Sequence, residues 1–166
     1  MNITRLFKHL LHFPWLVHYK FPPSSLNKIE ETITLSEKNH SAEIRFAIES
    51  SLSFFELLQN TPCFDRGVDI FSELRIWDTE ENNGVLIFLL LADRKVEIVA
   101  DRGLNKKISK DDWQAICDLM EQSFKQNKFE TGVIVGINEI TKKLVQHYPL
   151  KGQKSIDELP NKPVIL

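Results

Sequence analysis

The sequence predicts an α/β protein, a three-layer α/β/α sandwich with a small mixed central sheet. Apolar and polar residues alternate over residues 42–49, an almost unbroken apolar run covers residues 84–91, and helical spacing lies between them. A strand, a helix and then a fully apolar strand are typical of a right-handed parallel crossover, in which the second strand is buried on both faces. We therefore expect residues 84–91 at the centre of the sheet.

We divide the chain of 166 residues into three regions. Residues 1–23 form a basic amphipathic segment, and residues 24–148 form an α/β domain. Hydrophobic residues make up 42% of the whole chain, which is enough for one core. Residues 149–166 form an extended tail, whose last residues we expect to add an edge strand.

The first region combines an apolar stripe with positive charge. Apolar residues recur at helical spacing at Ile3, Leu6, Phe7, Leu10 and Leu11. The basic residues are Arg5, Lys8 and Lys20, and the first acidic residue is Glu30. The apolar stretch is too short to span a bilayer.

Two interpretations of this region remain open. One is a terminal helix that docks on its own domain. The other is that residues 1–21 contact a membrane surface or a protein partner, because Trp15 and Tyr19 favour an apolar–aqueous boundary. Three basic residues near an anionic surface contribute roughly 3 kcal/mol, so membrane binding is expected to be reversible and salt-sensitive.

The α/β domain begins with a helix and the first strand. A helical period over residues 26–33 predicts the helix, and the alternation over residues 42–49 predicts a half-buried strand. Thr61 followed by Pro62 is a typical helix start, and the apolar residues after it continue at helical spacing. This segment supplies the crossover helix.

An antiparallel partner strand and two further helices follow the central strand. Residues 95–100 alternate after a tight turn, which predicts the antiparallel strand. Ser109 opens a capping box, and the last helix runs from about 131 to 147. We expect Gly132 and Gly136 to allow this helix close packing on the sheet, because the dinucleotide-loop pattern of glycines is absent.

Polar residues gather at one edge of the predicted sheet. In an antiparallel pair, the loop before residues 84–91 and the loop after residues 95–100 lie at the same edge. Carboxylate and amide oxygens are hard ligands suited to Ca²⁺ or Mg²⁺. The expected metal ligands are Asp78, Glu80, Glu81 and Asp101. The expected ligand-binding residues are Asn82, Asn83 and Arg102. The alternative is ordinary solvated loop chemistry.

Composition excludes several classes of function. A net charge of −2 gives no field that would attract nucleic acid. No motif indicates an organic cofactor, a zinc site or a serine-hydrolase elbow. Cys63 and Cys117 fit no metal-ligand spacing and no disulfide framework, so we expect a reducing, cytoplasmic location, at the inner membrane face if residues 1–21 contact a membrane.

Several features of residues 24–148 together resemble a known family. They are Trp77 at a helix end, Asn83-Gly84 before an apolar strand, Gly103-Leu104 after the next strand, and the late glycines Gly132 and Gly136. This combination resembles the TPM domain, in a subgroup of soluble bacterial proteins. Where the family usually has Gly-x-Gly-Leu-Glu-Gly, residues 100–105 read Ala-Asp-Arg-Gly-Leu-Asn, so a glycine and the glutamate are replaced.

The resemblance implies two functions of different classes. The first is an accessory or protein-interaction module that acts with membrane proteins, with a LemA-type membrane protein as the implied partner. The second is a weak metal-assisted acid phosphatase, a phosphomonoester hydrolase. We prefer the module, because no nucleophile or base stands out in the sequence and a fold alone supplies neither.

Overall fold

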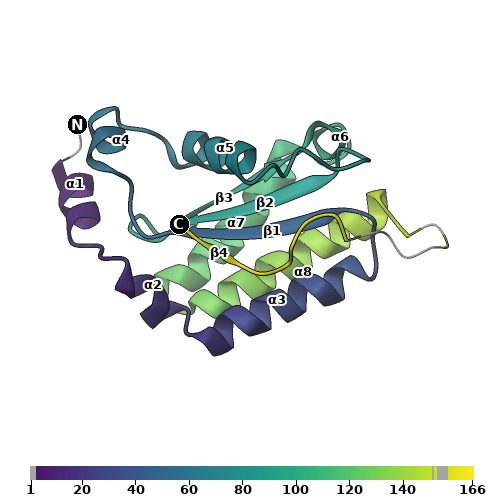
Figure 1. The fold of residues 1–166 in the computed structure, drawn as a ribbon, viewed down its shortest axis with the longest axis horizontal. Coiled ribbons are helices and arrows are strands. Elements are labelled where there is room, and N and C mark those ends of the chain that lie inside the picture. The colour runs from purple at the N-terminus through teal and green to yellow at the C-terminus, as the bar shows by residue number, and fades with distance from the viewer. Residues whose placement is uncertain (1–2, 151, 153–156) are drawn as a thin grey trace.

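The structure, a computed structural model, describes residues 3–150, 152 and 157–166, and it is an α/β/α sandwich (Figure 1). The described strands are β1 (Glu43–Glu49), β2 (Gly84–Leu90), β3 (Lys95–Ala100) and β4 (Val164–Ile165). They form a mixed sheet in the order β3-β2-β1-β4, in which only the β2–β3 pair of the described strands is antiparallel. The predicted fold class, the three predicted strands and the edge strand from the tail are confirmed.

The strand register brings three strand ends together. Glu43 pairs with Gly84, so β1 and β2 begin at the same end of the sheet. The antiparallel β3 ends there, and Asp101 N donates a hydrogen bond to Gly84 O at 2.9 Å. A side chain on Gly84 would collide with the carbonyl oxygen of Ile76, so this close approach requires glycine. We call this end of the sheet the polar sheet end.

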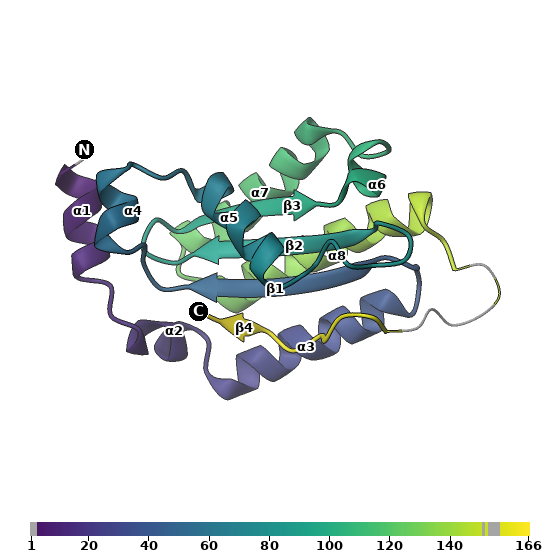
Figure 2. The ribbon, with the colours of Figure 1, turned by 45° about the horizontal axis from the view of Figure 1, so that its top comes forward.

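Helices cover both faces of the sheet (Figure 1, Figure 2). One face packs on α3 (Pro23–Glu37), α7 (Lys110–Lys125) and α8 (Phe129–His147). The other packs on α5 (Cys63–Glu73), with α4 (Phe54–Leu58) beyond it, and the short α6 (Arg102–Asn105) follows β3. Because helices cover both faces, every residue of β1 and β2 is buried. The prediction of a half-buried strand at residues 42–49 is therefore wrong.

The two late glycines pack on a helix and not on the sheet. A Cβ on Gly132 would lie 2.6 Å from Phe124 Cε1, and a Cβ on Gly136 would collide with Met120 Sδ. Phe124 and Met120 belong to α7. Close packing was predicted correctly, but its partner is the neighbouring helix.

The N-terminal region forms α1 (Ile3–Leu10) and α2 (Trp15–Lys20), which precede the sandwich at one end of the molecule (Figure 1). Residues 1 and 2 of the predicted contact segment lie outside the described residues. No helix in the described part of the chain is both long and apolar enough to cross a membrane. The polar sheet end and α6 lie at the opposite end of the sheet from α1 (Figure 2).

Candidate functional site

The two predicted loops meet at the polar sheet end. Gly103 N donates to Asn82 O at 3.1 Å, and Arg102 Nε donates to Asn82 Oδ1 at 2.9 Å. Asn82 has a φ of 51°, a left-handed conformation that asparagine tolerates in tight turns. The turn before β2 and the start of α6 therefore hold each other in place, with Arg102 exposed at the rim.

Two buried oxygen atoms at this end lack a hydrogen-bond partner among the described atoms. Asn83 is 1% exposed; its Nδ2 donates to Ser41 O at 2.8 Å, but its Oδ1 has no donor. Asp101 is 8% exposed; its Oδ1 accepts from Arg102 N at 2.6 Å, but its Oδ2 has no donor. A buried polar atom left without a partner costs about 1–3 kcal/mol, so each one calls for an explanation such as a bound ion.

Tyr148 and Glu81 border the same place. A Cβ built on Gly103 would lie 3.1 Å from the Tyr148 hydroxyl and 3.1 Å from Glu81 O. Burial, followed by the negative charges of Glu81 and Asp101, raises the pKa of Tyr148 above its ordinary value. The Glu81 carboxylate accepts from the Ser41 hydroxyl at 2.8 Å. Tyr148 was missed by the sequence reasoning, because it follows the end of α8 and no motif connects it to this turn.

The other predicted residues do not join one carboxylate cage. Asp78 and Glu80 are exposed, and Glu80 is engaged through its backbone N–H, which donates to Glu158 Oε2 at 3.0 Å. In the described part of the chain, no three of the predicted ligands Asp78, Glu80, Glu81 and Asp101 bring their carboxylate oxygens within 4.8 Å of one another. Of these four, Asp101 and Glu81 lie beside Asn83 or Tyr148.

A second acidic group lies on the β1 side of the polar sheet end. Oxygen atoms of Glu37, Glu43 and Asp157 lie within 4.8 Å of one another, the only such group in the described ranges. Glu37 Oε1 accepts from Ile44 N at 2.8 Å, and Glu43 Oε2 accepts from Leu159 N at 3.3 Å. Burial raises the pKa of Glu37 to about 8 and that of Glu43 to about 7. Both carboxyl groups therefore resist ionisation near neutral pH.

This second group had no sequence signal. Glu37 ends α3 and Glu43 begins β1, positions that read as an ordinary helix end and strand start. Only the return of the tail beside β1 adds Asp157 to them. A contact between residues so far apart in the chain follows from topology, which spacing rules do not predict.

Comparison with known proteins decides the family. The family model for the TPM domain matches residues 21–143, which is most of the chain and covers the whole polar sheet end apart from the tail and Tyr148. The chain belongs to the TPM domain family. The TPM match leaves α1 and α2 outside and includes every element from α3 to α7 and most of α8.

Two solved structures are similar to this TPM-domain chain. The NMR structure of the BA42 protein from the psychrophilic bacterium Bizionia argentinensis is 32% identical, with a TM-score of 0.76, over 86% of this chain and 93% of that one. The NMR structure of the N-terminal domain of a protein from P. gingivalis is 17% identical, with a TM-score of 0.60, over 78% of this chain and 81% of that one, and it shows the fold alone. No curated protein is significantly similar in sequence.

Proposed function

We propose that this TPM-domain protein is an accessory binding module that holds a divalent cation at the polar sheet end. The observation that carries the proposal is the pair of buried, unpartnered oxygens, Asn83 Oδ1 and Asp101 Oδ2, on adjoining strand ends. An amide oxygen and a carboxylate are both suitable ligands for a hard cation. The Glu81 carboxylate and the Tyr148 hydroxyl border the same place and offer further oxygen ligands for a cation.

The ligand set favours calcium over magnesium. Calcium accepts six to eight oxygen ligands in irregular geometry, whereas magnesium demands a near-ideal octahedron. The expected donors here come from a turn, a helix start and a helix end, which do not form a symmetrical cage. With one buried carboxylate, Asp101, we expect weak binding, with a Kd on the order of 10⁻⁴–10⁻³ M.

Calorimetric titration with CaCl₂ and MgCl₂ tests the proposal. Asp101→Asn keeps an oxygen for the Arg102 N–H but removes the charge, so we expect calcium affinity to fall about tenfold or more with the fold intact. Asp111→Asn, at an exposed acid on α7, is the matched control and should bind like the wild type. If Glu43→Gln abolishes binding while Asp101→Asn does not, the cation occupies the second acidic group and the proposal is wrong.

Phosphomonoester hydrolysis is a second candidate, favoured by the position of Arg102. Its guanidinium is anchored on Asn82 one residue after Asp101, where it could pair with a phosphate bound to the same cation. The test is turnover of p-nitrophenyl phosphate with calcium or magnesium. Turnover that disappears in both Asp78→Asn and Asp101→Asn proteins, with folding intact, would favour the phosphatase. No turnover in a cation-binding wild type is the result that the module proposal predicts.

A further inference from the structure

Helix α1 is docked on the domain by its polar side. Arg5 Nε pairs with Asp93 Oδ2 at 2.9 Å, and its Nη1 donates to Thr61 O at 3.0 Å. His9 is buried; its Nδ1 accepts from Leu52 N at 3.0 Å, and its Nε2 lies 3.2 Å from Asp93 Oδ1. Burial by itself raises the pKa of Asp93, but the interactions with His9 and Arg5 outweigh it, so the net pKa is lowered.

Most of the apolar side of α1 faces away from the core, although Leu6 of the same stripe packs against it. Ile3 is 62% exposed and Phe7 59%, and Leu10 and Leu11 are exposed beside them. Amphipathic helices of soluble proteins normally turn this stripe towards the core. The helix thus docks on its own domain, as the first interpretation expects, and it still presents most of its leucine–phenylalanine stripe outwards.

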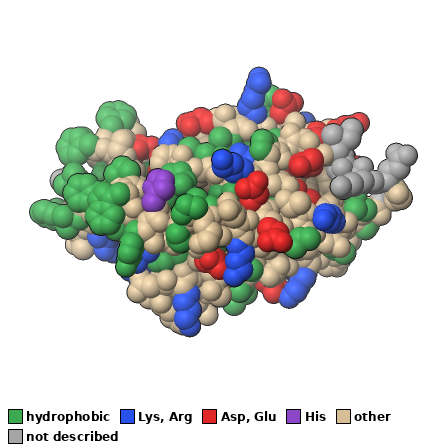
Figure 3. Space-filling view, turned by 60° about the horizontal axis from the view of Figure 1, so that its bottom comes forward, with side chains coloured by type: hydrophobic (Ala, Val, Ile, Leu, Met, Phe, Trp, Pro, Cys, Tyr) green, Lys and Arg blue, Asp and Glu red, His purple; other side chains and the backbone are tan. Residues whose placement is uncertain are grey.

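Two neighbouring helices extend the exposed apolar surface. Trp15 on α2 is 62% exposed, with Tyr19 on the same helix also exposed. Helix α4 lies beside α1 (Figure 1, Figure 2) and exposes Phe55 (66%), and Phe54 and Leu58 on the same helix are also exposed. Figure 3 shows that hydrophobic side chains gather at one end of the molecule. We call the exposed apolar side chains of α1, α2 and α4 the end patch; contiguous patches of this kind mark interaction surfaces.

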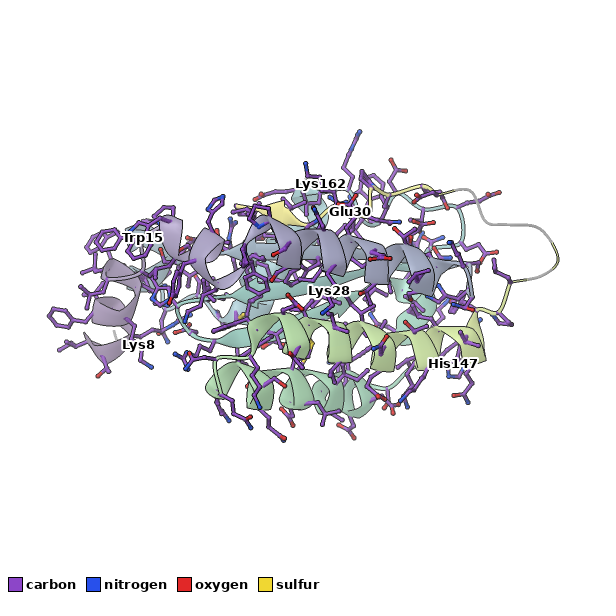
Figure 4. The ribbon with its side chains drawn as sticks, turned by 90° about the horizontal axis from the view of Figure 1, so that it is seen from below. Lys8, Trp15, Lys28, Glu30, His147 and Lys162 are labelled. Carbon is purple, nitrogen blue, oxygen red and sulfur yellow. The ribbon has the colours of Figure 1, made fainter. Side chains whose placement is uncertain are left out.

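The charged side chains of α1 and α2 are all basic. Lys8 is exposed on α1 and lies with Trp15 at the end opposite His147 (Figure 4), and Lys20 follows on α2. Between residues 3 and 29 there is no acidic side chain. The acid on α4, Glu56, accepts a hydrogen bond from Ser53 N and lies 3.3 Å from Arg66, which it shares with Glu49 and Glu73.

We propose that the end patch docks reversibly on an anionic lipid surface. Tryptophan and tyrosine, amphipathic side chains suited to the headgroup boundary, flank leucine and phenylalanine here, with lysines beside them. The patch projects at the end of the molecule, and this position suits contact with a flat surface better than contact with a partner's groove (Figure 1). Arg5 is engaged with Asp93, so the electrostatic part of the affinity rests on Lys8 and Lys20, which should contribute about fivefold each.

Sedimentation of the full chain with vesicles tests this proposal. We expect the protein to sediment with vesicles that contain phosphatidylserine, less with pure phosphatidylcholine, and less again at high salt. Phe7→Ser and Phe55→Ser should each reduce the vesicle partition constant about tenfold. Both side chains are exposed in the folded protein and are expected to enter the lipid. Leu35→Ser, at a comparably exposed leucine on α3 away from the patch, is the matched control and should leave binding unchanged.

The remaining outcomes separate other occupants of the end patch. Equal vesicle binding by the wild type and both phenylalanine variants would overturn the proposal, since the lipid contact would then lie elsewhere. No vesicle binding, together with self-association that Phe7→Ser abolishes, would assign the patch to a second copy of the chain. Binding only to vesicles that hold a LemA-type membrane protein would assign it to that partner and would also overturn the lipid proposal.

Discussion

The folded protein should lose stability as the pH rises, and Glu37 should cause much of that loss. Burial raises the pKa of Glu37 from an ordinary 4.5 to about 8. An acid with a raised folded pKa contributes stability that is complete below its unfolded pKa and is lost as pH rises through the folded pKa. The difference of about 3.5 pKa units corresponds to roughly 5 kcal/mol at 1.36 kcal/mol per unit. Because water reaches part of this side chain, we expect about 2–4 kcal/mol between pH 5 and pH 8.

The perturbation that isolates this effect is Glu37→Gln. Glutamine keeps an oxygen for the Ile44 N–H but cannot ionise, and it also removes a negative charge beside Glu43. The variant should therefore gain stability over the wild type progressively from about pH 5 to pH 8, measured by urea unfolding at each pH. Glu31→Gln, at an exposed acid on the same helix, is the control and should follow the wild-type curve. Parallel pH curves for Glu37→Gln and the wild type would refute the reasoning.

His40 acts in the opposite direction at lower pH, so the two effects must be separated. Burial lowers the pKa of His40 to about 4, and a base with a depressed folded pKa gains stability as pH rises from that value to its unfolded value of 6.5. The wild-type curve thus combines a rise and a fall over overlapping ranges. The difference between Glu37→Gln and the wild type cancels the His40 contribution, because both proteins contain His40.

Three further predictions concern the packing that supports the two surfaces. Gly84→Ala should destabilise the fold by about 1–3 kcal/mol in urea unfolding, because its methyl group would collide with Ile76 O, and an unchanged midpoint would contradict this. Arg66→Lys should cost about 1–3 kcal/mol, because the bidentate pair with Glu49 needs a guanidinium; equal unfolding midpoints would show that the pair contributes nothing. Asp93→Asn should loosen α1 without unfolding the sheet, measured as faster amide exchange in residues 3–10 only, whereas unchanged exchange would mean that its pairs with Arg5 and His9 do not hold the helix.

The sheet and its polar end were largely predictable because their signals are local. The apolar run at 84–91 identified β2, and alternation identified β1 and β3 within one residue of their ends. Antiparallel pairing of β2 and β3 then brought the loop before one and the loop after the other together, which the Gly103–Asn82 hydrogen bond confirms. Whether a cation binds there stays a prediction.

Two short helices were not predicted from the sequence, for different reasons. Ser53 and Glu56 form a capping box around α4, so a local signal was present but was overlooked in a short segment. Helix α6 is only four residues long, and its cap, Asp101, read equally well as a metal ligand. The same carboxylate does cap the helix through Oδ1, which leaves Oδ2 for another role.

The orientation of α1 was beyond reach of the sequence. Periodicity identified its apolar stripe, but periodicity does not say which side a helix turns to its neighbour. The deciding contacts, Asp93 with Arg5 and His9, join residues more than 80 positions apart. With these tertiary contacts in place, most of the stripe faces outwards and Leu6 packs against the core.

Anomalous diffraction from crystals grown with Mn²⁺ tests the central claim most directly, because manganese accepts the same oxygen ligands as calcium and identifies its own position. The account predicts an anomalous peak at the polar sheet end within bonding distance of Asn83 Oδ1 and Asp101 Oδ2, and a much weaker peak in crystals of Asp101→Asn at the same manganese concentration. A peak between Glu37, Glu43 and Asp157 alone, or no peak at a saturating concentration of manganese, would contradict it.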